Sequence, residues 1–504
     1  MNVKDGPKLR FIQADKKNLD RLDLEEAAQK NSKSTPADLP LLVSERALEE
    51  SEKVLAKQAR ESILQGYVPA VEFLPKPKQR YGNRPLAVLD PITRTFLTAL
   101  NIDLKEALPA SSRDDKFDDF ENYGTDRTGV WVVEFDIASC YEYVDHDILS
   151  RELVLQGAEQ QTINSLSNLF GAIFERDVGL PQGPRESDRL ADAYLSIVER
   201  RLKRRGYEVA RYADDFKIVV GSRREAFDAI EKCMEEARRV YLSLAEQKID
   251  FKRSEDLLDD IKIVKGLFGE YTETAFGELI DYSLVPGIYD DTIDEVYPEP
   301  DEVNFEATLS ILRDWSEAKG SQLSALARAG ALGIRTVKGF DSRIDNDILS
   351  AIVAKEPLRV KLISEYILER SETVNNWELI ADISQQERIS PWHKIWLLNT
   401  ASRLESKSCR GRSSFLDYAI EQVMDSHELV RLEAAWLLAV NESLDIDRLV
   451  TLYGGATNIS TVGLAAVAGL VNNSNTSNQL DSIRSDSRLN RSAFKWGSDY
   501  GSNA

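Results

Sequence analysis

Three aspartates of the sequence have the types and positions that could do chemistry together. Asp136 ends the apolar run VVEFDI, and Asp214 and Asp215 follow about eighty residues later inside RYADDF. If the run and the turn meet at one edge of a sheet, the repulsion between three carboxylates would be costly unless a cation lies among them. Oxygen ligands favour Mg²⁺ or Mn²⁺ over zinc. Two such ions, about 3.5–4 Å apart, activate an attacking hydroxyl and stabilise a leaving pyrophosphate.

Taken singly, the same residues have an ordinary explanation. Asp is a favoured turn residue, so Asp214 and Asp215 could simply form a turn and Asp136 could simply end a strand. The chemical interpretation therefore depends on the elements that must bring these residues together.

The segments around the aspartates predict a two-layer α+β unit. Residues 130–137 read as a buried strand, 185–205 as an amphipathic helix, and 207–221 as a hairpin that turns at 213–215. A second long helix is predicted over 227–246, with short strands in IDFKRSED and IKIVKGLFG. This order favours helices on one face of an antiparallel sheet.

The flanking segments differ in kind from this unit. Residues 1–60 read as helices, and an acidic linker is predicted over 271–305. From 306 to 504 the chain reads as successive amphipathic helices, which favours an all-α solenoid, and DSHELVRLEAAWLLAVNES resembles the second helix of a HEAT-type repeat. The last residues are small and polar, and they predict a mobile tail.

Composition sets limits on partners and compartment. A chain of 504 residues with a net charge of −21 is unsuited to coating nucleic acid, so any such contact is expected in a local groove of the less acidic first half. The three cysteines are too scattered for a disulfide framework, and no leader or long apolar run is found, which predicts a cytoplasmic protein without a membrane partner. No P-loop, GxSxG or HExxH motif supports an NTPase, a hydrolase or a metalloprotease.

The aspartates belong to a longer ordered pattern. FDIASCYEYVDHDIL, GLPQGPRESDRLADAYL and RYADDF resemble palm motifs A, B and C of the reverse-transcriptase family, in that order. RYGNRPLAVLDPITRTFLTAL is similar to the fingers element of this family, and LAEQK to motif D. The resemblance spans about residues 65–270 and implies a palm and fingers domain over 1–270 with RNA-directed DNA polymerase-like nucleotidyltransferase activity.

The resemblance implies roles for the acids and for one tyrosine. Asp136, Asp214 and Asp215 correspond to the catalytic, metal-binding carboxylates, with Mg²⁺ or Mn²⁺ as cofactor. Tyr141 corresponds to the steric gate against a ribose 2′-hydroxyl and implies dNTP substrates, with a packing tyrosine as the alternative.

Four further positions are implied by the same motifs. Gln182 and Gly183 correspond to the loop that contacts the incoming nucleotide, and Arg84 to the fingers arginine that neutralises triphosphate charge. Lys248 corresponds to the lysine that protonates pyrophosphate, although Ala245 stands where the family usually has Asn.

The segment after the palm departs from a typical template-copying enzyme, because an acidic helical array replaces a basic thumb. This architecture resembles the bacterial phage-defence reverse transcriptases, especially the abortive-infection (Abi) polymerases, in which a HEAT-like domain follows palm and fingers. The resemblance implies anti-phage defence, a homo-oligomer, and protein-primed, template-independent synthesis of DNA that stays linked to protein. Tyr500 of the tail is the candidate priming tyrosine, ahead of Tyr282, Tyr289 and Tyr297, with an ordinary exposed tyrosine as the alternative for each.

Other interpretations stay open from the sequence. The enzyme could copy a cognate non-coding RNA, or the chain could be a non-catalytic helical scaffold that binds a phage protein. A basic cluster near the end of the helix over 185–205 could bind product phosphates or complement the helix dipole. Its members are Arg200, Arg201, Lys203, Arg204 and Arg205.

Overall fold

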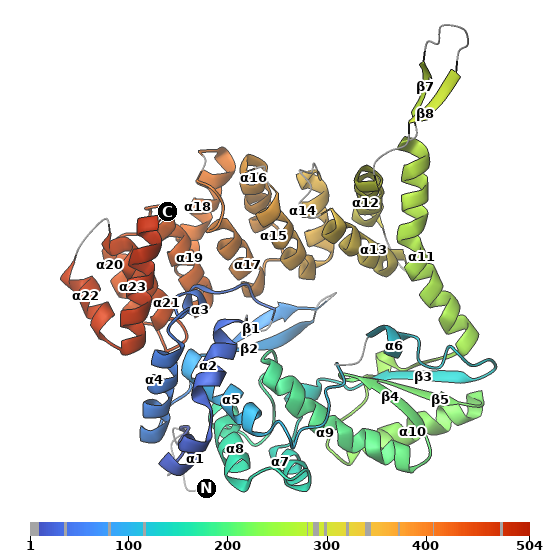
Figure 1. Cartoon of the computed structure of the whole chain (residues 1–504), viewed down its shortest axis with the longest axis horizontal. Coiled ribbons are helices and arrows are strands. Elements are labelled where there is room, and N and C mark those ends of the chain that lie inside the picture. Colours follow the sequence, from blue (N-terminus) through green and yellow to red (C-terminus); the bar gives the residue numbers. More distant parts are fainter. Residues whose placement is uncertain are drawn as a thin grey trace. The chain divides into compact units, whose positions relative to one another are not determined.

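The structure is a computed structural model of the chain, and its described residues divide into two compact units (Figure 1). The sheet unit comprises Met1–Lys76, Arg84–Leu257 and Ile420–Ala504, and the helical unit comprises Pro77–Asn83 and Leu258–Ala419. The described residues are 10–34, 38–78, 82–113, 117–279, 281–285, 292–296, 300–318, 322–337, 344–370, 373–406, 408–473 and 477–503.

A four-stranded antiparallel sheet, in the order β4-β5-β3-β6, forms the centre of the sheet unit. Helices α9 and α10 pack against this sheet, as the two-layer prediction requires. Stacked rings of Phe135 and Phe216, 5.0 Å apart, join the two central strands. The strands are β3 (Trp131–Asp136), β4 (Glu208–Tyr212), β5 (Asp215–Val220) and β6 (Asp250–Arg253), and the helices are α9 (Arg185–Arg204) and α10 (Arg223–Arg238).

One predicted strand is wrong. IKIVKGLFG lies inside helix α11 (Ser254–Leu279) and not in a strand. Leu257 and Ile261 are both buried, and their spacing of four residues is that of one helix face. The buried residues of this segment therefore follow a helical period, although its β-branched residues favour a strand.

Helices and a two-stranded sheet surround the sequence before β3. Buried Asp90 organises this region, because its carboxylate accepts from the backbone N–H groups of Ile92 and Thr93 at the start of α5 and from the hydroxyl of Tyr67. The elements are α1 (Lys16–Arg21), α2 (Leu24–Ser32), α3 (Val43–Arg46), α4 (Glu52–Gln65), β1 (Val71–Pro77), β2 (Asn83–Leu89), α5 (Pro91–Asp103) and α6 (Phe117–Glu121). Between β3 and α9 lie η1 (Cys140–Glu142), α7 (His146–Leu155) and α8 (Gln160–Phe174).

The last helices of the chain belong to the sheet unit, so the predicted domain 306–504 does not coincide with a compact unit. They are α19 (Glu428–Val440), α20 (Ile446–Gly454), α21 (Thr461–Asn472), α22 (Asn478–Ser485) and α23 (Arg488–Asn503). The expected mobile tail is instead α23, which packs closely on α21. Glycines permit this approach, since a Cβ on Gly469 would lie 1.9 Å from the carbonyl oxygen of Phe494.

Two carboxylates join the first and last parts of the sheet unit. Glu72 of β1 accepts from the backbone N–H groups of Glu428 and Leu429, at 2.7 and 3.0 Å, and so caps α19. Glu433 of α19 in turn accepts from the N–H of Val43, at 3.0 Å, where α3 begins. Each segment thus satisfies donors at a helix end of the other.

The helical unit is an array in which each helix contacts its second neighbour, as α14 does α16 and α15 does α17. The predicted linker over 271–305 contains the end of α11, the hairpin of β7 (Asp281–Val285) and β8 (Thr292–Val296), and the start of α12. The array consists of α12 (Pro300–Glu317), α13 (Gln322–Thr336), α14 (Asn346–Lys355), α15 (Val360–Glu369), α16 (Thr373–Ser384), α17 (Pro391–Ala401) and α18 (Arg410–Gln422), with η3 (Pro357–Arg359) before α15. Over the described ranges, no helix has the length and apolarity needed to cross a membrane.

Candidate active site

The sheet brings the three aspartates to one edge. Asp136, the last residue of β3, pairs in register with Asp215, the first residue of β5. Asp214 occupies the turn between β4 and β5, and its carbonyl accepts from the N–H of Ile137 at 3.2 Å. The three carboxylates therefore come from two neighbouring strand ends, as the sequence pattern predicts.

The charges of this cluster oppose one another. Burial raises the pKa of Asp136, and the nearby carboxylate of Asp214 raises it further. Burial, with the carboxylates of Asp214 and Asp136, raises the pKa of Asp215 to about 6. Lys248 forms an ion pair with Asp136 and lowers the pKa of that carboxyl, so one ammonium group offsets part of the repulsion.

The donor set suits a hard divalent cation, although the side chains are not assembled around one. Among the described residues, no group of three or more His, Cys, Asp or Glu side chains is placed to hold a metal ion. The ammonium of Lys248 lies on Asp136, where a cation would otherwise be needed. The residues still fit Mg²⁺ or Mn²⁺, because all three offer oxygen and their mutual repulsion is relieved by positive charge.

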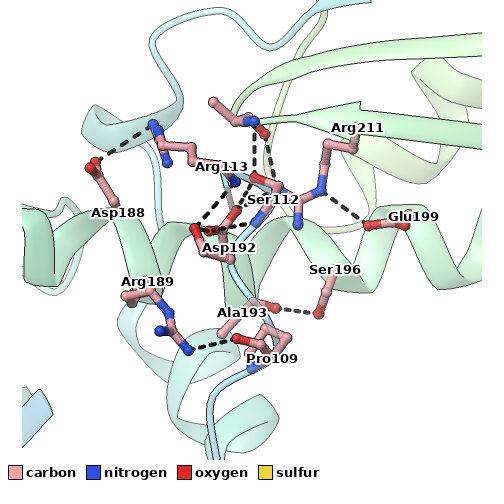
Figure 2. A network of polar contacts seen from close by, with 12 residues as sticks. Pro109, Ser112, Arg113, Asp188, Arg189, Asp192, Ala193, Ser196, Glu199 and Arg211 are labelled. Atoms are coloured by element: carbon pink, nitrogen blue, oxygen red, sulfur yellow. Dashed lines mark hydrogen bonds and ion pairs between the residues drawn. The ribbon is translucent and has the colours of Figure 1, made fainter. Parts of the chain in front are cut away.

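The turn that carries Asp214 is held by a buried polar network (Figure 2). Ala213 has a φ of 56°, a left-handed conformation that costs an alanine about 1 kcal/mol. Its N–H donates to Ser112 Oγ at 3.0 Å, and its carbonyl accepts from Arg211 at 2.9 Å. Both backbone polar groups of the strained residue are therefore fixed by side chains from elsewhere in the unit.

An ion pair supports this network from α9. Arg211 contacts Asp192 at 2.6 Å and Glu199 at 3.1 Å, and the side chains of Arg211 and Asp192 are 4% and 1% exposed. Asp192 also accepts from Ser112 Oγ at 2.7 Å. Loss of one partner would leave a buried charge uncompensated, so the network is expected to be rigid. The sequence analysis assigned no role to Ser112 or to Asp192, although Asp192 lies in the segment that resembles motif B.

Tyr141, the predicted steric gate, is 9% exposed and its hydroxyl is engaged. It donates to Asp188 at 2.5 Å and accepts from Arg113 at 3.3 Å. Burial raises the pKa of Tyr141, and the negative charge of Asp188 raises it further. These two partners hold the ring of Tyr141, which lies within η1, against the first turn of α9. Arg113 and Asp188 are therefore site residues that the sequence analysis did not identify.

The remaining predicted contacts lie on the loop before α9 and on β2. The carbonyl of Gln182 accepts from the N–H of Ala87 at 2.8 Å, so this loop is joined to β2. Gly183 has a φ of 128°, a value that side chains rarely allow. Arg84 is exposed on β2, and no hydrogen bond or ion pair among the described residues joins its side chain to the aspartates.

The candidate priming tyrosine lies in a packed helix. The ring of Tyr500 on α23 is 5.1 Å from that of Trp436 and 5.6 Å from that of Trp496. The guanidinium of Arg46 lies 5.5 Å from the centre of the Tyr500 ring. Of the alternatives, Tyr282 is on β7, and Tyr289 and Tyr297 lie outside the described residues.

Comparison with protein families identifies the domain that contains Asp136, Asp214 and Asp215. Residues 74–275 match the family described as reverse transcriptase (RNA-dependent DNA polymerase). A reverse transcriptase domain is therefore present, and it supports the polymerase-type nucleotidyltransferase expected from the sequence.

Solved structures and curated proteins add little to this match. An RdRp complex is 12% identical, with 95% of this chain and 50% of that chain covered and a TM-score of 0.31. This chain thus spans half the length of that relative. The apo telomerase from Candida Tropicalis is 10% identical, with 89% and 73% covered and a TM-score of 0.28. A comparison with curated proteins found no match.

Proposed function

We propose that this chain is a DNA polymerase of the reverse-transcriptase superfamily that uses dNTPs. The observation that carries the proposal is the in-register pairing of Asp136 with Asp215, beside Asp214, within the reverse transcriptase domain. Mg²⁺ or Mn²⁺ held by these carboxylates would supply Lewis-acid stabilisation of the phosphoryl charge.

In the proposed reaction, a hydroxyl oxygen attacks the α-phosphorus of a dNTP and loses its proton to water. A new P–O bond forms, the bond to the β-phosphate breaks, and pyrophosphate leaves with the bonding electrons. The side chain of Lys248 is 59% exposed and adjoins Asp136, so its ammonium can give a proton to this leaving group. We assign Tyr141 to the exclusion of a ribose 2′-hydroxyl, and Gln182, Gly183 and Arg84 to binding of the nucleotide.

The test is incorporation of labelled dNTPs by the purified full chain in Mg²⁺ or Mn²⁺. We expect product with the native chain and none with the double variant Asp214→Ala, Asp215→Ala. Equal product from both chains would refute the assignment of the site.

A finer proposal concerns the biological role, priming and template. We infer that the enzyme acts in anti-phage defence as an Abi-type polymerase, primes from a protein hydroxyl and copies no template. The support is the combination of the reverse transcriptase domain with an acidic helical array, because such an array offers few cations to a long duplex. We also infer HEAT-like repeats and a homo-oligomer from the resemblance to the Abi polymerases, and the contacts between second-neighbour helices agree with stacked repeats.

Covalent priming is tested by running the labelled product on a denaturing gel with and without protease. A band that shifts with protease supports protein priming, and peptide mapping of the adduct then tests Tyr500. Because its ring is packed between aromatic residues, attachment at Tyr500 requires that α23 first leave α21. Adducts confined to another residue would exclude it.

A second candidate is an enzyme that copies a non-coding RNA. The family description, RNA-dependent DNA polymerase, favours this version. Purified protein that absorbs at 260 nm and loses activity after RNase treatment would support it. Nucleic-acid-free protein that still incorporates dNTPs would favour the untemplated enzyme.

A further inference from the structure

Five arginines line one cavity of the sheet unit. The cavity has a volume of about 380 Å³ and is bordered by α7, the C-terminal half of α9 and the end of α10. None of the three aspartates lines this cavity. Along α9, the rise from Asp192, which supports the turn of Asp214, to Arg200 and Arg204 is about 12 to 18 Å. Its arginines are Arg151, Arg200, Arg201, Arg204 and Arg239.

Acidic side chains neutralise only part of this charge. Glu152 is the one acid among the residues that line the cavity, and it is buried. Three of the arginines have carboxylate partners, and each pair is identified by its shortest contact. They are Arg200 with Glu152 at 2.8 Å, Arg201 with Glu236 at 3.5 Å, and Arg239 with Glu235 at 3.0 Å.

The other two arginines have no carboxylate partner within the part of the chain that is described. Arg151 uses its Nε to donate to the carbonyl of Asp147 at 3.2 Å, which leaves its terminal N–H groups available. Arg204 is exposed and forms no ion pair with a described residue. A guanidinium presents donors in a planar fork that matches two oxygens of a phosphate.

The helix dipole explains part of this cluster but not all of it. Arg201 and Arg204 are in the last turn of α9, and Arg239 follows α10, where positive charge is favourable. Arg151 enters the cavity from the middle of α7, where the dipole gives no such preference. In a chain of net charge −21, a positively charged hollow attracts anions against the field of the rest of the molecule.

An aromatic ring lies at the same cavity. Tyr241 lines it, is 69% exposed and has a φ of 57°, an uncommon backbone conformation for a tyrosine. An exposed aromatic face stacks on nucleic-acid bases whatever their sequence.

We propose that this cavity binds the phosphate groups of a nucleotide or of a nucleic-acid strand. Arg151 and Arg204 bind phosphate oxygens, and Tyr241 stacks on a base. Both sources present the same phosphate chemistry, and the experiment distinguishes them. The site does not depend on catalysis at the aspartates.

The test measures binding to the full chain in EDTA, so that divalent ions cannot hold a ligand at the aspartates. The ligands are inorganic tripolyphosphate and dATP, followed by calorimetry, and a labelled oligothymidylate, followed by fluorescence anisotropy. The test variant is Arg151→Ala, Arg204→Ala. The matched control is Arg224→Ala, Arg491→Ala, which removes the same charge from exposed positions outside the cavity.

We expect the test variant to weaken binding by about tenfold or more, which is 1.4 kcal/mol, while the control stays within about twofold of the native chain. Loss for tripolyphosphate and dATP identifies a free nucleotide as the source. Loss for the oligothymidylate, with a salt slope smaller by about 1.4 for two lost phosphate contacts, identifies a strand. The proposal would be overturned if the test variant bound all three ligands with the affinity of the native chain, or if the native chain bound none of them.

Tyr241→Asn separates stacking from charge. Asn tolerates the left-handed backbone, so this variant removes the ring without adding strain. We expect weaker binding of dATP and the oligothymidylate and unchanged binding of tripolyphosphate. If Tyr241→Asn binds all three ligands with the affinity of the native chain, the stacking role is refuted.

Discussion

Asp215 shows the conflict between charge and stability that a polymerase site requires. Burial and the carboxylates of Asp214 and Asp136 raise its pKa to about 6, so the charged form is disfavoured in the folded chain. We predict that Asp215→Asn, without divalent ions at pH 7, raises the free energy of unfolding by roughly 0.5–1 kcal/mol and lowers dNTP incorporation. Thermal unfolding measures the first effect, and Asp228→Asn on the exposed face of α10 is the control. A lower midpoint for Asp215→Asn than for this control would contradict the prediction.

Tyr141 makes a prediction about substrate selection. Its ring, held by Asp188 and Arg113, stands at the position assigned to the 2′-hydroxyl gate. We predict that Tyr141→Ala narrows the preference for dNTPs over rNTPs by about tenfold or more, whereas Tyr141→Phe keeps the preference, because the ring excludes the hydroxyl by its volume. Competition between labelled dNTPs and rNTPs measures the ratio. An unchanged ratio in Tyr141→Ala would assign this tyrosine to packing.

His393 predicts a pH dependence in the helical unit. Burial lowers the pKa of His393 to about 4. Its Nε2 lies 3.0 Å from the carbonyl of Pro357, and its Nδ1 accepts from the N–H of Ser390, so the neutral tautomer satisfies both partners.

Because the unfolded chain binds a proton at this histidine near pH 6.5 and the folded chain only near 4, stability falls as the pH decreases through that window. We predict a loss of about 3 kcal/mol from this group between pH 7 and 4, and a flatter profile in His393→Gln. Chemical unfolding followed at several pH values measures both chains. Parallel profiles would show that His393 does not titrate in this way.

At the scale of elements, the turn between β4 and β5 depends on residues outside it. Ser112 accepts from the N–H of Ala213 and donates to Asp192, so it joins the turn to α9. We predict that Ser112→Ala lowers stability by about 1–3 kcal/mol and lowers kcat with little change in KM for dNTPs, because Asp214 loses its fixed position. Steady-state kinetics measures both constants.

Ser62, on α4, supplies a control for this positioning role. It is partly buried and lies outside the network of Figure 2, so Ser62→Ala tests the loss of a hydroxyl alone. A change in KM alone for Ser112→Ala, or the same kinetic change in both variants, would show that Ser112 does not position the turn.

The sequence predicted the hairpin of β4 and β5 because polar turn residues interrupt two β-rich runs, and it predicted α9 because its apolar residues follow a helical period. It did not predict the helical state of IKIVKGLFG, where β-branched residues favour a strand locally while the buried face of α11 has a spacing of four. It also could not reveal Ser112 or Arg113, because their partners lie far away in the chain and leave no local pattern.

At the scale of the whole molecule, the packing of α21 on α23 is part of the sheet unit and not an appendage. A Cβ on Gly469 would meet the backbone of Phe494, so we predict that Gly469→Ala separates the helices and lowers stability by about 2 kcal/mol or more. Gly454→Ala is the matched control, since a Cβ there meets nothing within 4 Å, and it should raise stability by about 0.5–1 kcal/mol. Thermal unfolding distinguishes the two, and equal midpoints would refute the close packing.

The return of the last helices to the first part of the chain is the feature that sequence reasoning could least foresee. Helical periodicity indicates that a helix buries one face, but it does not say against which partner. Glu72 and Leu429 are separated by 357 positions, and neither residue type is unusual for its element. The small, polar residues of the last segment predicted a mobile tail because the sequence did not reveal a packing partner. In the structure, these small residues allow α23 to pack closely on α21.

The mutual capping by Glu72 and Glu433 has a consequence for synthesis on the ribosome. Glu72 leaves the exit tunnel 356 residues before Glu428, so Glu72 and the N–H of Val43 must wait for these partners until α19 is translated. A message cut short before codon 428 would lack both of these helix caps, and we expect the sheet unit of such a chain to fold incompletely.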